Sequence, residues 1–212
     1  MVIKLKKKLK FTELVLPNKR LNYFVGTVLL LGILSGSIFL MISSSGDKKS
    51  VMDSISLFFS NVSENKINSG LAFRNSLIIN YLFIFIVFIC GLSMIGVFFN
   101  IFILYLKGFL VGFSISSIFL TYHFKGIVGV LVYVVPSQLI NLFLLFLLTV
   151  YSLMFSWYLI KMIFFKKGRE RSSLKRYFVI FVFCILFSFL SSVFEVYVFP
   201  KVLKLFVSFY VK

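Results

Sequence analysis

The stretch YLKGFLVGFSISSIFLTYHFKGIVGVLVYVVP, residues 105–136, decides how this chain folds. It places two lysines, four glycines, the only histidine of the chain and a proline inside otherwise apolar sequence. The sequence on either side consists of long apolar runs with basic flanks. We therefore expect this stretch to build the shape that distinguishes the chain from a plain set of membrane helices.

The composition of the whole chain indicates a membrane protein. Hydrophobic residues make up 60% of the 212 positions, charged residues only 14%, and mean hydropathy is +1.06. Soluble domains have about a quarter charged residues, so this surface needs lipid around it, where only helices and closed barrels satisfy the backbone. The apolar runs are continuous rather than alternating, which favours helices. The predicted fold is an all-α polytopic integral membrane protein.

The net charge of +17 does not indicate nucleic-acid binding, because most of the basic residues flank apolar runs. Such flanks orient membrane spans and attract anionic lipid headgroups. The two cysteines, Cys90 and Cys184, both lie within apolar runs. They are expected to be small buried hydrophobic residues, with no disulfide between them. We expect no cofactor and no metal site.

The pattern of apolar runs predicts five transmembrane helices, with the N-terminus in the cytoplasm and the C-terminus outside. The expected spans cover residues 22–42, 76–106, 108–122, 127–160 and 177–199. A basic leader (1–21) and a basic loop (161–176) are expected in the cytoplasm. A polar loop (43–75) and an amphipathic tail (200–212) are expected outside, with short amphipathic helices lying at the membrane interface.

Residues 108–136 allow two topologies. In the first, 108–122 crosses the membrane and 127–160 returns as one helix kinked at Pro136. In the second, 108–122 and 127–135 form a re-entrant hairpin on the cytoplasmic side. The hairpin would move the basic loop 161–176 outside, against the positive-inside rule. The first topology is therefore preferred.

The outer loop contains a short amphipathic helix at 51–62. Its apolar residues recur at helical spacing and form one face: Val51, Ile55, Phe58, Phe59 and Val62. This face either rests on the outer leaflet or docks a partner outside the membrane.

Two ionisable residues are expected near opposite membrane boundaries. Lys107 is expected at the inner boundary, where it either snorkels to headgroups or pins the start of the glycine-rich helix. Glu195 is expected near the outer boundary, where His123 or Lys125 could pair with its carboxylate and lower the cost of burying it. No hydrolase, metalloprotease or nucleotide-binding motif occurs in the chain, and we expect no catalytic residue.

Further polar and small residues could mediate helix packing. Gln138 and Asn141 either satisfy the carbonyl that Pro136 frees at Val132 or line a docking groove. Gly32 and Gly36 form a small-xxx-small step, which faces either another helix or lipid.

Several segments together resemble stage II sporulation protein M, the SpoIIM family of endospore-forming bacteria. The resemblance rests on Phe73-Arg74-Asn75-Ser76, on Ile95-Gly96, and on the KGF-x-x-GF pattern of Lys107, Gly108, Phe109, Gly112 and Phe113. It continues at Val135-Pro136-Ser137-Gln138, where the family pattern is closer to LPQN, and it covers nearly the whole chain.

The resemblance implies a non-enzymatic membrane scaffold. Such a scaffold would recruit and localise two peptidoglycan-degrading partners, SpoIID-like and SpoIIP-like, at the septal or engulfing membrane of the mother cell. The alternative is a permease, or a transporter subunit, for a small solute or lipid. A scaffold should tolerate changes at Lys107 and Glu195, and a permease should not. The sequence leaves homo-oligomer formation open.

Overall fold

The computed structural model describes residues 19–64, 66, 68–165 and 171–202. The elements are α2 (Lys19–Ile42), α3 (Ser45–Ser63), α4 (Ser69–Gly91), α5 (Gly96–Gly129), α6 (Val135–Phe165) and α7 (Arg171–Val193), with π-helical turns η1 (Val130–Val134) and η2 (Phe194–Val198). No strand occurs among these residues. Five stretches are long and apolar enough to cross a membrane: Lys19–Ile42, Ser69–Gly91, Gly96–Phe124, Gln138–Ile163 and Leu174–Val202. The predicted all-α polytopic class is confirmed.

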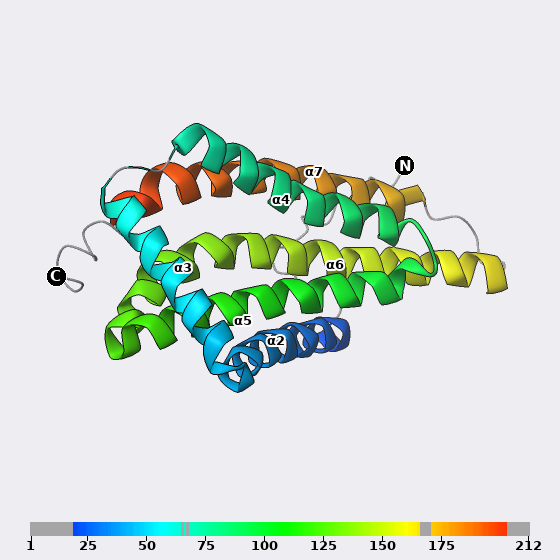
Figure 1. The fold of residues 1–212 in the computed structure, drawn as a ribbon. Helices are drawn as coiled ribbons and strands as arrows, with labels where there is room; N and C mark the ends of the chain where they lie inside the picture. The colour runs from blue at the N-terminus through cyan, green and yellow to red at the C-terminus, as the bar shows by residue number, and fades with distance from the viewer. Residues whose placement is uncertain (1–18, 65, 67, 166–170, 203–212) are drawn as a thin grey trace.

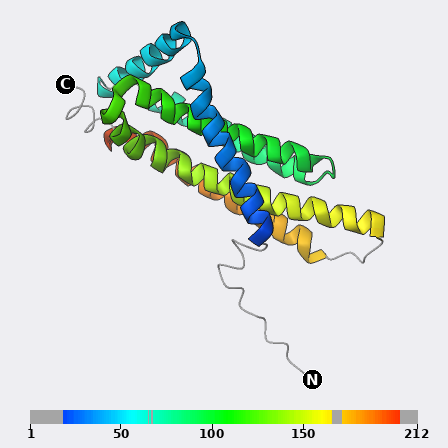
Figure 2. The same cartoon turned by 90° about the horizontal axis from the view of Figure 1, so that it is seen from below.

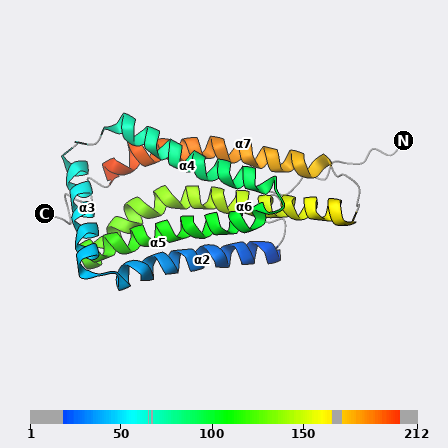
Figure 3. The ribbon, with the colours of Figure 1, turned by 45° about the vertical axis from the view of Figure 1, so that its right-hand side comes forward.

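The spanning helices lie side by side, and α3 lies across one end of the bundle (Figures 1 and 3). The starts of α2 and α7 and the turn between α4 and α5 lie at the opposite end. Seen from below, α2 crosses the other helices at an angle (Figure 2). This order of crossings agrees with the five-span layout. The assignment of the α2 start to the cytoplasm stays a prediction from the positive-inside rule.

Helix α6 runs through the centre of the bundle. In the most apolar part of its spanning stretch 72% of the residues are buried, compared with 22% in α2 and 17% in α4. Side chains from α6, such as Leu145, Leu148 and Val150, form the middle of the main apolar core. The peripheral helices present exposed leucine and phenylalanine side chains that a bilayer would cover.

The predicted boundary between the second and third spans was wrong. The chain reverses at 92–95, between α4 and α5, and not at Lys107. This turn is apolar and carries no charge, so the hydropathy of the chain does not fall there. Glycine is required at its end, since a Cβ on Gly96 would overlap the carbonyl oxygen of Cys90. Residues 108–122 are thus the second part of α5 and not a short separate span.

The next reversal lies at His123, whose backbone has φ 51° and ψ −131° within the residues of α5. The chain then returns through η1 into α6, which runs to the end where α2 begins (Figure 1). The preferred crossing topology agrees with this path, and the re-entrant hairpin does not.

Both prolines among the described residues follow a π-helical turn. Pro136 follows η1, and Pro200 follows η2 in the same register. Proline lacks an N–H and clashes with the carbonyl four residues earlier, and widening the preceding turn relieves both problems. The expected kink at Pro136 therefore takes the form of a π-helical turn. Pro200 does not end the last helix, which continues to Val202; the rest of the predicted tail lies outside the described residues.

Helix α3 is longer than the predicted 51–62. Ser44 caps its start, with Oγ accepting a hydrogen bond from the backbone N–H of Asp47 at 3.2 Å. Phe59 and Val62 are 1% and 4% exposed and pack against α5 and η1, with Ile55 and Phe58 partly buried beside them. Phe59 and Val62 are therefore covered by the chain's own helices and not by the outer leaflet, which corrects the leaflet interpretation for this part of the face. Val51 and Ile55 border a groove beside α5, and the partner-docking interpretation stays a prediction.

Candidate functional site

A cluster of polar side chains fills part of the bundle between α4, α5, α6 and α7. Its inward-facing members include one charged residue, Lys107 of α5, which is 7% exposed. Two amides face the same interior, Asn80 of α4 at 7% and Asn141 of α6 at 6%. Helix α7 adds Ser188, Ser191 and Ser192, each at most 1% exposed. Buried polar groups in a membrane span are costly, so such a concentration marks a candidate site.

Hydrogen bonds join α4 to the end of α7 within this cluster. Ser76 Oγ donates to Glu195 Oε2 at 2.7 Å, and the hydroxyl oxygens of Ser76 and Ser192 lie 3.2 Å apart. Asn80 Nδ2 donates to both of these hydroxyl oxygens at 3.3 Å. The network therefore gives one oxygen of the Glu195 carboxylate a hydrogen bond from inside the bundle.

Lys107 lies about three turns into α5 and not at the membrane boundary, so the snorkelling interpretation was wrong. Its Nζ lies 5.1 Å from the centre of the Phe83 ring, a cation–π contact. The Glu195 carboxylate attracts the ammonium electrostatically. Within the described part of the chain the only ion pair joins Lys66 to Glu64. The attraction between Lys107 and Glu195 thus acts without a direct salt bridge.

The space beside Lys107 is very small. A cavity of about 10 Å³ is bounded by Asn80, Phe83, Lys107 and Asn141, together with Ile84 and Leu145. This is about the room that one water molecule needs. The arrangement can hold four helices together through charge and hydrogen bonding, and it has no room for an organic ligand.

Glu195 does not have the partner expected for it. His123 is exposed at the reversal of the chain. Among the described residues, His123 and Glu195 do not form an ion pair. The Lys125 side chain is not among the side chains that the structure describes. Matched depth alone suggested these partners, whereas the π-helical turn η2 carries Glu195 toward α4.

The KGF-x-x-GF residues contact three different parts of the molecule: the polar cluster, helix α2 and the groove beneath α3. Lys107 faces the polar cluster, while Gly108 and Gly112 face α2. Phe109 packs on Phe39 of α2 with ring centroids 5.6 Å apart. Phe113 lines a groove beneath α3 together with Val51 and Ile55.

Helices α2 and α5 approach to backbone contact. A Cβ on Gly36 would overlap the carbonyl oxygen of Phe109, and one on Gly112 would overlap that of Ile33. Gly32 and Gly108 face each other in the same crossing. Ser37 Oγ donates to the Gly112 carbonyl at 3.1 Å across the contact. The small-xxx-small step thus binds a helix of the same chain.

Of the polar residues after Pro136, Asn141 belongs to the cluster, since it lines the Lys107 cavity. Gln138 is half-buried, one turn nearer the end where α3 lies. The Pro136 side chain lies outside the described ones. The docking-groove interpretation of these residues stays a prediction.

Comparison with known families identifies the chain. The family model described as stage II sporulation protein M, SpoIIM, matches residues 25–200. The match includes all five spans, in whole or in large part, and every residue of the polar cluster. This chain belongs to the SpoIIM family. It is a sporulation-related, multi-pass membrane protein, which confirms the family resemblance of its sequence. Searches of curated proteins and of solved structures found no match.

The sequence reasoning did not single out the serines that complete the cluster in this SpoIIM family member. Ser188, Ser191, Ser192 and Glu195 follow the spacing i, i+3, i+4 and i+7, which places them on one helix face. A polar face within an apolar span is the signal that could have revealed them. Ser76 carries no such signal, because its role depends on how α4 packs on α7.

A second set of polar contacts holds the turn at 92–95. Ser156 Oγ donates to the carbonyls of Gly91 and Ser93 at 2.9 and 3.1 Å, and the Tyr177 hydroxyl donates to the Phe88 carbonyl at 2.9 Å. Asn100 Nδ2 donates to Ser152 Oγ nearby. Side chains of α6 and α7 thus satisfy carbonyls at the end of α4 and hold this turn of the SpoIIM bundle in place.

We expect Glu195→Gln to destabilise the protein more than Lys107→Met does. Glutamine keeps an acceptor for Ser76 but removes the negative charge that attracts the buried ammonium. Methionine removes the buried charge and retains the packing. The double variant should therefore be more stable than Glu195→Gln alone, with a coupling on the order of 1 kcal/mol. Equilibrium unfolding in mixed detergent micelles measures all four proteins, and strictly additive effects would contradict the coupling.

Proposed function

We propose that this SpoIIM family member is a non-enzymatic membrane scaffold. It recruits and localises SpoIID-like and SpoIIP-like peptidoglycan-degrading partners at the septal or engulfing membrane of the mother cell during endospore formation. The observation that carries the proposal is the family match over residues 25–200. The degradative chemistry belongs to the partners, so the scaffold itself needs no catalytic side chain.

The exposed face of α3 is the surface we assign to these partners. Its buried face packs on the bundle through Phe59 and Val62, which holds the helix across the end of the bundle predicted to face the cell wall (Figure 3). On the opposite face, Asp53, Leu57 and Asn61 are exposed at four-residue spacing, and Leu57 is 62% exposed. A rigidly held helix with an exposed leucine between polar residues suits recognition of a folded partner domain.

Arginine substitutions on this face test the proposal. We expect Leu57→Arg combined with Asn61→Arg to reduce recovery of both hydrolases at least about tenfold in pull-downs from sporulating cells. The reason is that two added charges at an interface must be desolvated without partners. The membrane level of the scaffold should not change, because neither side chain is buried.

Leu92→Arg is the matched control. Leu92 is also an exposed leucine, at 46%, but it lies in the turn at the opposite end of the bundle. Equal recovery of the hydrolases with the α3 variant and the wild type would refute the assigned surface.

The permease is the second candidate function, favoured by the buried charge of Lys107 in the bundle interior. The two functions differ in what Lys107 does. In a scaffold Lys107 stabilises helix packing, so Lys107→Met should retain hydrolase capture. In a permease the same substitution should abolish transport. The one-water volume of the adjacent cavity favours the scaffold.

A further inference from the structure

A groove opens on the lipid-facing side of the bundle, between α2, α5 and α6 at the end where α2 begins. Its volume is about 420 Å³. Apolar side chains form its walls, including Phe24 of α2, Ile101 of α5 and Met154 of α6. Arg20 and Trp157 line it as well. The groove therefore combines an apolar interior with a cationic residue at the start of a spanning helix.

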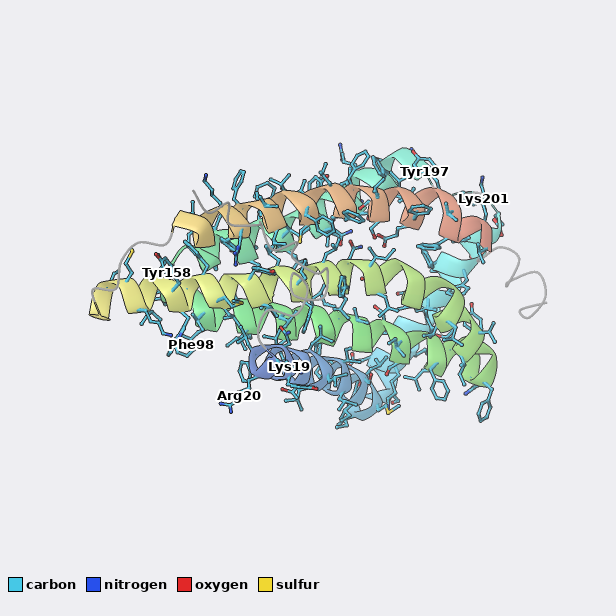
Figure 4. All side chains as sticks on the ribbon, turned by 180° about the vertical axis from the view of Figure 1, so that it is seen from behind. Lys19, Arg20, Phe98, Tyr158, Tyr197 and Lys201 are labelled. Atoms are coloured by element: carbon cyan, nitrogen blue, oxygen red, sulfur yellow. The ribbon has the colours of Figure 1, made fainter. Side chains whose placement is uncertain are left out.

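The mouth of the groove is basic. Lys161 Nζ lies 5.7 Å from the centre of the Trp157 ring. Lys161 is therefore a second cation, after Arg20, in contact with the lining of the groove. Lys19 and Arg20 lie together at the start of α2, at the same end as Phe98 and Tyr158 (Figure 4). The acidic residues within the described ranges, Asp47, Asp53, Glu64 and Glu195, belong to α3, its C-cap and η2 at the other end. No described carboxylate therefore competes for these cations.

We propose that this groove binds an anionic phospholipid of the bilayer. One acyl chain lies along the apolar walls, and the phosphate lies between Arg20 and Lys161. The guanidinium of Arg20 matches a phosphate through paired hydrogen bonds. Trp157 lies within two turns of Ile163, the end of its spanning stretch, and tryptophan is typical of the region where span ends meet headgroups. Charge complementarity selects the lipid over a second apolar helix, because a helix would leave two cations unmatched. This inference does not depend on the scaffold function.

Trp157 is the only tryptophan of the chain, so its fluorescence reports on the groove directly. The full chain is placed in nanodiscs of phosphatidylcholine that contain the same fraction of brominated phosphatidylglycerol or brominated phosphatidylcholine. Bromine quenches the emission of a tryptophan that it contacts, and each sample is normalised to the same lipid without bromine. We expect brominated phosphatidylglycerol to quench with an apparent affinity at least about fivefold higher.

The cations are tested with Arg20→Gln combined with Lys161→Gln. This variant should lose the preference for phosphatidylglycerol while its quenching by phosphatidylcholine persists. Lys201→Gln is the control, since Lys201 lies at the other end of the bundle (Figure 4); it should keep the preference. The proposal is overturned if both lipids quench the wild type equally, which indicates bulk lipid only, or if the double variant keeps the preference. It is also overturned if neither lipid quenches, because a protein segment then covers the groove.

Discussion

Replacing Gly36 or Gly112 by alanine should destabilise the protein by at least about 2 kcal/mol. Each new Cβ would overlap a backbone carbonyl oxygen of the facing helix, that of Phe109 or of Ile33. A backbone atom cannot rotate away as the tip of a side chain can, so α2 and α5 must move apart. Separation would also weaken the hydrogen bond from Ser37 Oγ to the Gly112 carbonyl. Equilibrium unfolding in mixed micelles measures the loss.

Gly26→Ala is the control on the same helix. A Cβ at Gly26 would meet only the Phe146 ring at 4.0 Å, an ordinary van der Waals contact. We therefore expect a change within about 0.5 kcal/mol at this position. If Gly26→Ala and Gly36→Ala destabilise equally, the backbone contact between α2 and α5 is not what holds α2 in place.

Phe59→Ala should release α3 from the end of the bundle. Phe59 is 1% exposed, and its ring lies 5.0 Å from that of Tyr122 in a cluster with Val62, Ile118 and Val130. Truncating a buried phenylalanine costs about 3–5 kcal/mol through lost burial and the cavity it leaves. The apolar interface beneath α3 is small, so we expect α3 to open locally while the spanning helices stay folded.

Hydrogen exchange over residues 45–63 measures this opening. The amides of α3 should exchange much faster in Phe59→Ala, and those of α6 should not change. Leu57→Ala is the matched control, because Leu57 lies on the same helix but is 62% exposed; its exchange should match that of the wild type. Identical exchange in the two variants would show that the Phe59 cluster does not hold α3.

Phe59→Ala and the Leu57→Arg/Asn61→Arg variant together test whether the partners need α3 to be docked or need only its exposed face. A released α3 should weaken hydrolase capture in Phe59→Ala even though its exposed face is unaltered. The Leu57 and Asn61 arginine substitutions alter only that face. Loss of capture in both cases would indicate that the partners recognise α3 in its docked position.

Much of the architecture could be predicted from local sequence. The composition and continuous apolar runs predicted an all-α membrane protein with five spans, and the structure has five such stretches. The reversal near His123 and the bend near Pro136 were also predicted, because the short polar segment 123–126 interrupts the apolar run and proline disturbs a helix through its own ring. The glycines of the KGF-x-x-GF pattern and Pro136 also carried part of the resemblance to the SpoIIM family, and the family match confirmed that resemblance.

The position of the turn at 92–95 could not be obtained in this way. Gly91 and Gly96 bound it, but its residues are as apolar as the helices on either side. High hydropathy therefore continues through the turn to Leu106, and the sequence predicts the end of the span just before Lys107. The carbonyls at this turn are satisfied by Ser156 and Tyr177, from helices that are distant in the sequence. A turn stabilised in this way leaves no local charge or proline to mark it.

The sequence by itself determined which segments enter the membrane, since transfer of a helix into lipid depends on its own side chains. Only the tertiary structure decided what each face of those helices contacts. Phe59 and Val62, on the face of α3 that could have rested on the outer leaflet, are covered by α5 and η1. The lysine expected at a boundary lies among Phe83, Asn80 and Asn141. The physical reason is that burial and pairing are set by neighbouring helices, whose contacts depend on where the chain reverses.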